Sequence, residues 1–85
     1  MQFTDQFVND NFDKYFEFQS QDDEHGFIHV NENVIEACDI EYDADDYTYT
    51  YKNVKYDSVI DIATTNQEVK NVYFQEMYDN NWMHN

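Results

Sequence analysis

Carboxylate side chains dominate the chemistry that this sequence offers. The 85 residues hold 19 Asp and Glu against four Lys and no Arg, which gives a formal net charge of −15. In two places the carboxylates recur at regular spacing, at Asp10, Asp13 and Glu17 and at Asp39, Glu41, Asp43 and Asp45. Carboxylates bind divalent cations, exchange protons in catalysis, or present negative charge to a basic partner. The residues around each row discriminate among these three uses.

The second row begins like a calcium-binding loop. Asp39, Glu41 and Asp43 match the first three ligand positions of an EF-hand loop, which also needs glycine at its sixth position and glutamate at its twelfth. The sequence has Ala44 and Thr50 at those two positions. Because both diagnostic positions differ, we expect no dedicated calcium site.

Transition-metal and catalytic patterns are missing from the sequence. His25 and His29 flank Gly26, where a loop is expected to give way to a strand, and neither stands at a recognisable ligand spacing from Cys38. With nineteen carboxylates some pair is always close, so proximity alone does not identify an acid–base pair. The chain also has no glycine-rich phosphate loop and no arginine to stabilise a developing anion. We expect no metal, no cofactor and no enzymatic activity.

Presentation of negative charge to a partner is the remaining use of the carboxylates. On a helix, Asp10, Asp13 and Glu17 share one face. On a strand, alternate side chains share a face and stand about 6.6–6.8 Å apart, which is near the spacing of phosphates along a nucleic acid strand. We therefore predict two rows that imitate the phosphates flanking a groove. With neighbouring carboxylates included, the predicted phosphate surrogates are Asp10, Asp13, Glu17, Asp22, Asp23, Glu24, Asp39, Glu41, Asp43, Asp45 and Asp46.

The same charge excludes several kinds of ligand. Without arginine forks or a basic patch, the chain is not expected to bind nucleic acid directly, and an anionic membrane surface would repel it. No apolar stretch approaches the roughly 20 residues of a membrane span, and the first residues lack the basic region of a signal peptide. The single Cys38 permits no internal disulfide and fits a reducing compartment. We expect a cytoplasmic protein.

The elements that must position the carboxylates are predicted from periodicity. Apolar residues at helical spacing predict a helix over about residues 4–19, with Thr4 as its N-cap. Residues 20–25 are polar and are expected to form a loop. A second helix is predicted to follow a capping box at Thr65–Glu68 and to run to about residue 80.

Between the two predicted helices the apolar pattern changes to alternation, which is typical of strands. Residues 27–30 and 34–42 are predicted to form a hairpin, Tyr47–Tyr51 is the clearest strand, and residues 54–62 resume the alternation. The predicted fold is one α+β domain over residues 1–85, with an N-terminal helix, a three- to four-stranded antiparallel sheet and a C-terminal helix.

Aromatic residues make up 19% of the chain, and each large ring buries on the order of 150–250 Å². A disordered acidic tail would be poor in aromatics, so a compact core is expected in spite of the charge. The helices are expected to cover one face of the sheet, which would place Tyr47, Tyr49 and Tyr51 mainly in the core. Trp82, near the end of the last helix, is the better candidate for an exposed anchor.

Length, acidity, missing arginine and the two carboxylate rows together resemble the small acidic inhibitors that phages and mobile elements direct against nucleic-acid-binding host proteins. These include anti-restriction and anti-CRISPR DNA mimics and uracil-DNA glycosylase inhibitors. The resemblance is to the class, because no motif ties the chain to one named family. It implies a competitive inhibitor in the bacterial host cytoplasm, bound in the basic groove of a defence nuclease, a Cas effector or another DNA- or RNA-binding protein.

Two other functions fit the same composition. An immunity protein or antitoxin for a basic nuclease toxin would use nearly the same chemistry, with a partner encoded beside it. An acidic adaptor domain would use its charge only for solubility, and its binding would survive moderate salt.

Overall fold

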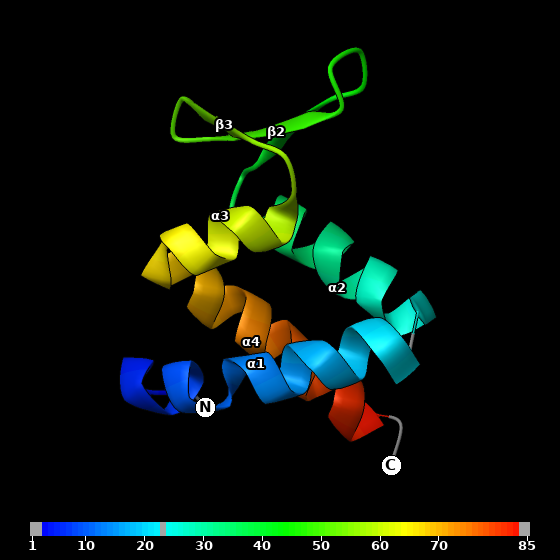
Figure 1. Cartoon of the computed structure of the whole chain (residues 1–85), viewed down its shortest axis with the longest axis vertical. Coiled ribbons are helices and arrows are strands. Elements are labelled where there is room, and N and C mark those ends of the chain that lie inside the picture. The colour runs from blue at the N-terminus through cyan, green and yellow to red at the C-terminus, as the bar shows by residue number, and fades with distance from the viewer. Residues whose placement is uncertain (1–2, 23, 84–85) are drawn as a thin grey trace.

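The chain folds as four helices and a small three-stranded antiparallel sheet over the residues that the structure describes (Figure 1). This computed structural model describes the backbone of residues 3–22 and 24–83, and the side chains of residues 3–21 and 25–80. The elements, in chain order, are α1 (Asp5–Asp22), α2 (Glu24–Ala37), β1 (Glu41–Asp43), β2 (Thr48–Tyr51), β3 (Val54–Tyr56), α3 (Val59–Thr65) and α4 (Gln67–Met83). The predicted α+β class is confirmed.

Helix α1 begins where the sequence predicts and ends later. Thr4 caps it, because the Thr4 hydroxyl accepts a hydrogen bond from the Phe7 amide at 3.1 Å. The predicted loop over residues 20–25 is wrong, since α1 continues to Asp22 and α2 starts at Glu24. Polar residues suit an exposed helical turn as well as a loop, so the polar composition of this segment does not by itself exclude helix.

The predicted hairpin of residues 27–30 and 34–42 is wrong, because α2 covers residues 27–37; of the second predicted strand only Glu41 and Tyr42 are in a strand, within β1. Val30 and Val34, one helical turn apart, are fully buried in the shared core. Asn31, which falls between the two predicted strands, instead donates from its side chain to the Phe27 carbonyl at 2.7 Å within the helix. Burial of the two valines therefore overrides the strand preference of the β-branched residues in this segment.

The sheet is built from short strands in the order β1-β2-β3. Its central row pairs Tyr42 with Tyr49 and Tyr49 with Tyr56. Lys52 and Asn53 connect β2 to β3 with φ angles of 49° and 68°, as the two central residues of a type I′ turn require. The clear strand at Tyr47–Tyr51 is confirmed from Thr48 onward.

The alternation predicted over residues 54–62 stops at Tyr56, and the described residues contain no fourth strand. The Ser58 side chain accepts a hydrogen bond from the Asp61 amide at 3.2 Å and so caps α3. This cap lies inside the segment predicted to be a strand. The predicted C-terminal helix is confirmed as α4, which starts at Gln67.

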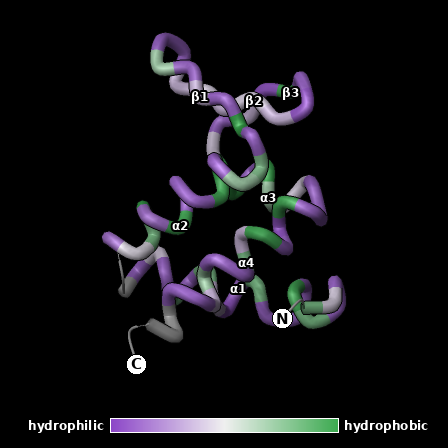
Figure 2. Tube along the Cα trace, turned by 180° about the vertical axis from the view of Figure 1, so that it is seen from behind, coloured by the Kyte–Doolittle hydropathy of each residue, from purple (hydrophilic) through white to green (hydrophobic). Residues whose placement is uncertain are grey.

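Helix α4 packs against the three other helices and contributes Tyr73, Phe74 and Met77, all fully buried, to the core. The sheet stands at one end of the long axis, on the side of α3 that faces away from α1 (Figure 1). Figure 2 shows the two loops of the sheet as mainly hydrophilic, whereas hydrophobic stretches gather where the helices face one another. Among these residues, no helix is both long and apolar enough to cross a membrane.

The predicted burial of the sheet tyrosines holds for Tyr51 and in part for Tyr49, but not for Tyr47. Tyr51 is buried, Tyr49 is half-buried, and Tyr47 is 74% exposed. Tyr47 precedes β2 and adopts a left-handed backbone with φ of 57°, so it does not follow the alternation of the strand.

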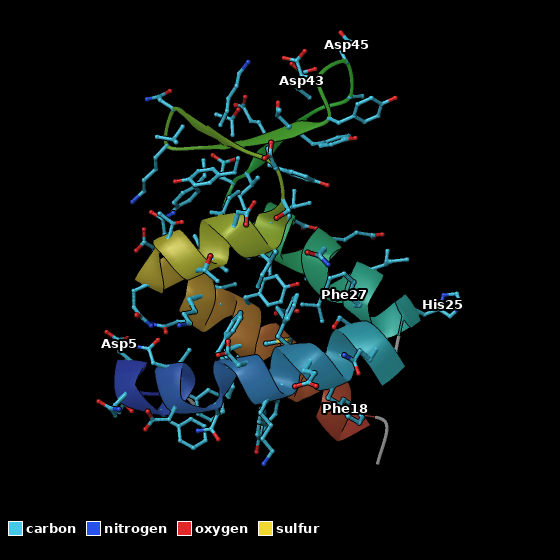
Figure 3. All side chains as sticks on the ribbon, viewed as in Figure 1. Asp5, Phe18, His25, Phe27, Asp43 and Asp45 are labelled. Atoms are coloured by element: carbon cyan, nitrogen blue, oxygen red, sulfur yellow. The ribbon has the colours of Figure 1, made fainter. Side chains whose placement is uncertain are left out.

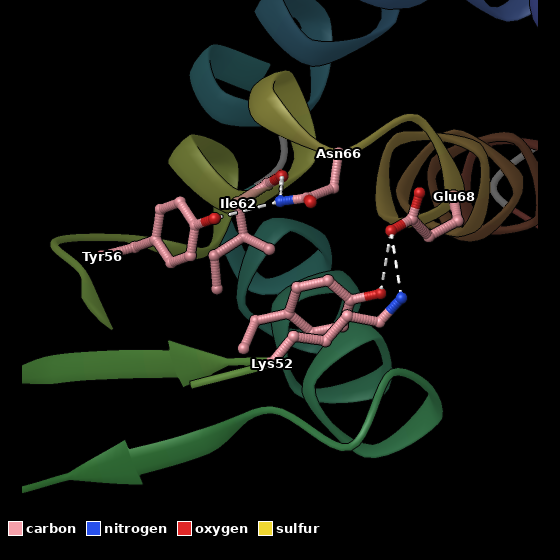
Figure 4. Close-up of polar contacts among 6 residues, drawn as sticks. Lys52, Tyr56, Ile62, Asn66 and Glu68 are labelled. Carbon is pink, nitrogen blue, oxygen red and sulfur yellow. Dashed lines mark hydrogen bonds and ion pairs between the residues drawn. The ribbon is translucent and has the colours of Figure 1, made fainter. Parts of the chain in front are cut away.

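Polar contacts fasten the sheet to the helices (Figure 4). The Tyr51 hydroxyl donates to Glu68 Oε1 at 3.1 Å, and Lys52 Nζ lies 3.6 Å from the same oxygen. Nearby, Asn66 Nδ2 donates to the Tyr56 hydroxyl at 3.2 Å. Burial, followed by the neighbouring Glu68 carboxylate, raises the pKa of Tyr51 above its ordinary value. The sheet is thereby held at a defined angle to α3 and α4.

Candidate functional site

Nearly all the described carboxylates face solvent. Sixteen of the nineteen have described side chains, because those of Asp22, Asp23 and Glu24 lie outside the described set. Fifteen of the sixteen are exposed, and Glu76 is half-buried. Among the described residues, the fold therefore buries mainly apolar side chains, together with Gln19, and places its charge on the surface.

Lysine neutralises little of this charge. Within the described residues, lysines form two ion pairs, Lys52 with Glu68 at 3.6 Å and Lys55 with Asp46 at 3.4 Å. The four side chains of these two pairs are each more than half exposed. Lys70 instead lies over the Phe12 ring, with Nζ 5.3 Å from the centroid. Exposed pairs of this kind are worth about 0–1 kcal/mol, so they hold the charges only weakly.

Amide side chains provide the carboxylates with hydrogen bonds instead. Asn33 Nδ2 donates to Glu76 Oε1 at 2.8 Å, and Gln6 Nε2 donates to Asp10 Oδ1 at 2.9 Å. Asn71 Nδ2 likewise donates to an oxygen of Asp5 at 2.8 Å. An amide donor satisfies a carboxylate oxygen without cancelling its charge. The surface therefore stays strongly negative even where its carboxylates are ordered.

The first predicted row lies on α1 as expected. Asp10, Asp13 and Glu17 are all exposed, whereas Val8 and Phe12 of the same helix are buried. The carboxylate row thus occupies the face of α1 that is turned away from the core. Asp22 is the last residue of α1, and Glu24 is the first residue of α2. The predicted surrogate Asp23 lies outside the described residues.

The second predicted row is interrupted, so the prediction of one strand with four alternating carboxylates is wrong. Only Glu41 and Asp43 belong to β1. Asp39 lies in the turn that ends α2, with φ of 56°, and the flanking Ile40 amide donates to the Ile35 carbonyl at 3.0 Å. This arrangement is a Schellman motif with Asp39 at its left-handed position, which accounts for the break in the row.

Asp45 and Asp46 lie in the loop between β1 and β2. Asp43 Oδ1 accepts hydrogen bonds from the amides of Asp45, at 2.9 Å, and Asp46, at 3.4 Å. One carboxylate therefore shapes the loop that presents the next two. Figure 3 shows Asp43 and Asp45 at the outer end of the hairpin, directed away from the helices. Glu41, Asp43, Asp45 and Asp46, all exposed, are called the hairpin carboxylates below.

The two acidic regions do not flank a common groove. The hairpin stands at one end of the molecule and α1 crosses the other, along a long axis of 37 Å (Figures 1 and 3). The two carboxylate rows therefore do not form the two edges of one groove. Each region is a separate candidate interface.

His25 and His29 lie differently from the sequence-based expectation, because both belong to α2. His25 and His29 are one turn apart and exposed, and His29 Nε2 lies 3.2 Å from Asn33 Nδ2. Across the described side chains, no group of three or more His, Cys, Asp and Glu residues could hold a metal ion. Burial, followed by the charge of Glu68, raises the pKa of the half-buried Cys38 thiol, which disfavours its reactive thiolate.

One surface feature was missed by the sequence-based reasoning. Ile28 and Ile35 of α2, with Ile60 of α3, line an apolar groove that also contacts Tyr49. The alternation of residues 27–42 and of residues 54–62 assigned these isoleucines to a sheet. Their spacing on a helix, with Glu32 between Ile28 and Ile35, is the signal that would have identified this face.

Comparisons with protein-family models, with curated proteins and with solved structures found no match to this chain. The function is therefore argued from the geometry of the acidic surface and the groove.

Proposed function

We propose that this protein is a DNA-mimic inhibitor that binds the basic nucleic-acid-binding surface of a partner protein. The observation that carries the proposal is the surface charge: fifteen exposed carboxylates, two of them in ion pairs with lysine among the described residues. A surface of this sign and density attracts a partner that is built to hold phosphates. A nuclease, a Cas effector or another DNA- or RNA-binding protein of the bacterial host has such a surface.

The hairpin carboxylates are the favoured contact. Glu41 and Asp43 occupy alternate positions of β1, which places them about 6.8 Å apart on one face of the strand. Asp45 and Asp46 extend the charge to the end of the loop, beside the exposed Tyr47 ring. The hairpin thus combines phosphate-like charges with an aromatic side chain, and aromatic residues are enriched at interfaces. The α1 row is a second contact of the same chemistry.

A pull-down from a bacterial lysate tests this proposal. The protein is immobilised at low salt, and the bound material is eluted with a salt gradient or with excess duplex DNA. We expect a basic nucleic-acid-binding protein that both treatments release, because the same contacts are electrostatic and compete with phosphates. A partner that survives moderate salt and excess DNA would contradict mimicry and indicate an adaptor.

Two matched triple variants then identify the contact surface. Glu41→Gln, Asp43→Asn and Asp45→Asn neutralise three of the four hairpin carboxylates, and Asp10→Asn, Asp13→Asn and Glu17→Gln neutralise the α1 row; each set changes two Asp and one Glu. Amides are used because Asp43 must still accept hydrogen bonds in its loop. We expect the hairpin variant to bind the captured partner about tenfold more weakly or worse, with a shallower salt dependence. A larger loss in the α1 variant would assign the interface to the helix.

A further inference from the structure

An apolar groove lies where α2, β2 and the start of α3 meet. It has a volume of about 360 Å³, and its apolar lining consists of Phe27, Ile28, Ile35, Tyr49, Val59 and Ile60. Ile28 is 50% exposed, on a helix whose other face buries Val30 and Val34. A β-branched apolar side chain on the solvent side of a helix is not needed for this core. Phe27 and Ile35 of α2 are partly buried against the core, so Ile28 is the side chain that leaves apolar surface open to solvent at the groove.

The groove continues into an exposed aromatic surface. The Tyr49 ring in its wall lies 4.8 Å, centroid to centroid, from the Tyr42 ring. Tyr42 is 48% exposed and stands between two of the hairpin carboxylates, Glu41 and Asp43. An aliphatic groove next to partly exposed tyrosines has the composition of an interface core.

Every charged residue that lines the groove or adjoins its lining in sequence is acidic. Glu32 is part of its lining, and the exposed Glu36 follows one turn later on α2. The exposed Asp57 and Asp61 flank the residues of α3 that complete the opposite wall. No lysine belongs to the described lining, and the two lysines nearest to it in sequence, Lys52 and Lys55, pair with Glu68 and Asp46. An apolar centre with a carboxylate rim is complementary to an apolar side chain flanked by Lys and Arg.

We propose that this groove receives one aliphatic side chain from a basic segment of the partner protein. This inference rests on the proposed function and specifies how the partner is recognised. A second copy of the chain is the wrong occupant, because it also carries a net charge of −15 and would be repelled. The carboxylates attract any basic protein, whereas the groove discriminates by shape and apolar contact. Selectivity among basic proteins therefore comes from the groove.

Two fluorescent peptides test the groove directly. Each peptide has one central residue flanked by lysines and arginines. The central residue is leucine in one peptide and serine in the other. We expect the leucine peptide to bind roughly three- to tenfold more tightly, because the groove buries part of one aliphatic side chain. The measurement is fluorescence anisotropy at low and at raised salt, and the ratio of the two affinities should survive screening while both affinities fall.

Matched substitutions locate the effect. Ile28→Thr changes the groove, and Val54→Thr makes a similar change on β3 at nearly the same exposure, 51% against 50%. The preference for leucine should fall below about twofold in Ile28→Thr and remain in Val54→Thr. In the native protein, the leucine peptide should also shift the methyl resonances of Ile28, Ile35 and Ile60, and the serine peptide should not.

The outcomes separate this inference from the proposed function. Equal binding of both peptides, lost at raised salt, would overturn the groove and leave the acidic surface as the contact. Loss of the preference in both variants would also overturn it. Failure of both peptides to bind at low salt would contradict the proposed function and the groove together.

Discussion

Asp39 and Asp43 carry two of the fifteen exposed charges, and each also shapes the backbone beside it. Asp39 takes the left-handed conformation that ends α2, which Asp tolerates better than most residues. Asp43 accepts two backbone hydrogen bonds at the tip of the hairpin. Replacement of these residues by lysine would change the backbone as well as the charge. Asparagine separates the two roles, because it keeps the hydrogen-bond acceptor and the left-handed preference.

Tyr73 provides the first prediction at the residue scale. It is fully buried, and its hydroxyl donates to Asn31 Oδ1 at 3.2 Å. Burial raises its pKa well above the ordinary value of about 10, and the hydrogen bond to Asn31 offsets this only in part. Because the folded pKa is raised, this contribution to stability is complete below pH ~10 and is lost as the pH rises further.

We expect Tyr73→Phe to lower the free energy of unfolding by about 0.5–1.5 kcal/mol at neutral pH, since Asn31 loses its donor. Above pH ~10 the variant should lose stability less steeply than the native protein, because one fewer tyrosine ionises on unfolding. Urea titrations across this pH range give both quantities. Tyr47→Phe, at the exposed position, is the control, and an identical pH profile for native protein and Tyr73→Phe would refute the argument.

At the scale of the elements, the sheet depends on its turns. Its strands have three, four and three residues, so hydrogen bonding along them is limited. Lys52 and Asn53 set the register of β2 with β3 through two consecutive left-handed residues. The contacts of Tyr51 and Lys52 with Glu68 then hold this hairpin against α4. Because β2 also pairs with β1, a change in the β2–β3 turn at Lys52 and Asn53 is expected to alter the orientation of the β1–β2 hairpin that carries the hairpin carboxylates.

The turn gives a prediction with opposite signs for two substitutions. Asn53→Gly should raise the free energy of unfolding by a few tenths of a kcal/mol to about 1 kcal/mol, because glycine adopts positive φ without a steric penalty. Asn53→Val should lower it by about 1–2 kcal/mol, the cost of a left-handed β-branched residue. Chemical denaturation measures both values. Equal stability of the two variants would mean that this turn does not limit the fold.

For the whole molecule, the surface charge opposes folding and favours partner binding. Fifteen exposed carboxylates repel one another on a body of 37 × 26 × 19 Å. The core of α4 and its neighbouring helices must overcome that repulsion. Both effects are electrostatic, so salt weakens both.

Salt should therefore stabilise the free protein and weaken its complex. From low salt, where the Debye length is about 30 Å, to 1 M, where it is about 3 Å, we expect the free energy of unfolding to rise. The increase should be on the order of 1 kcal/mol, comparable to one close pair of like charges in water. Urea unfolding at each salt concentration measures the increase, and partner affinity measured in parallel should fall. A stability that decreases with salt would show that attractive pairs, such as Lys52 with Glu68, outweigh the repulsion.

Local sequence was sufficient where one pattern matched one environment. The aromatic face of α1, the apolar spacing of α4 and the Tyr-Thr alternation of β2 each agree with the element that forms. Composition alone also determined that the surface is acidic and that arginine takes no part in it. These properties depend on residue type and on short-range periodicity, and both can be read without knowledge of distant contacts.

Only the tertiary structure decided what residues 24–42 become. Val30 and Val34 suit a strand locally, but α4 offers them a shared buried face only when they lie one helical turn apart. That choice moved Asp39 into a helix-ending turn, interrupted the predicted carboxylate row, and created the groove beside Ile28. A row of charges and an apolar groove both depend on which residues become neighbours, and burial against distant segments determines this.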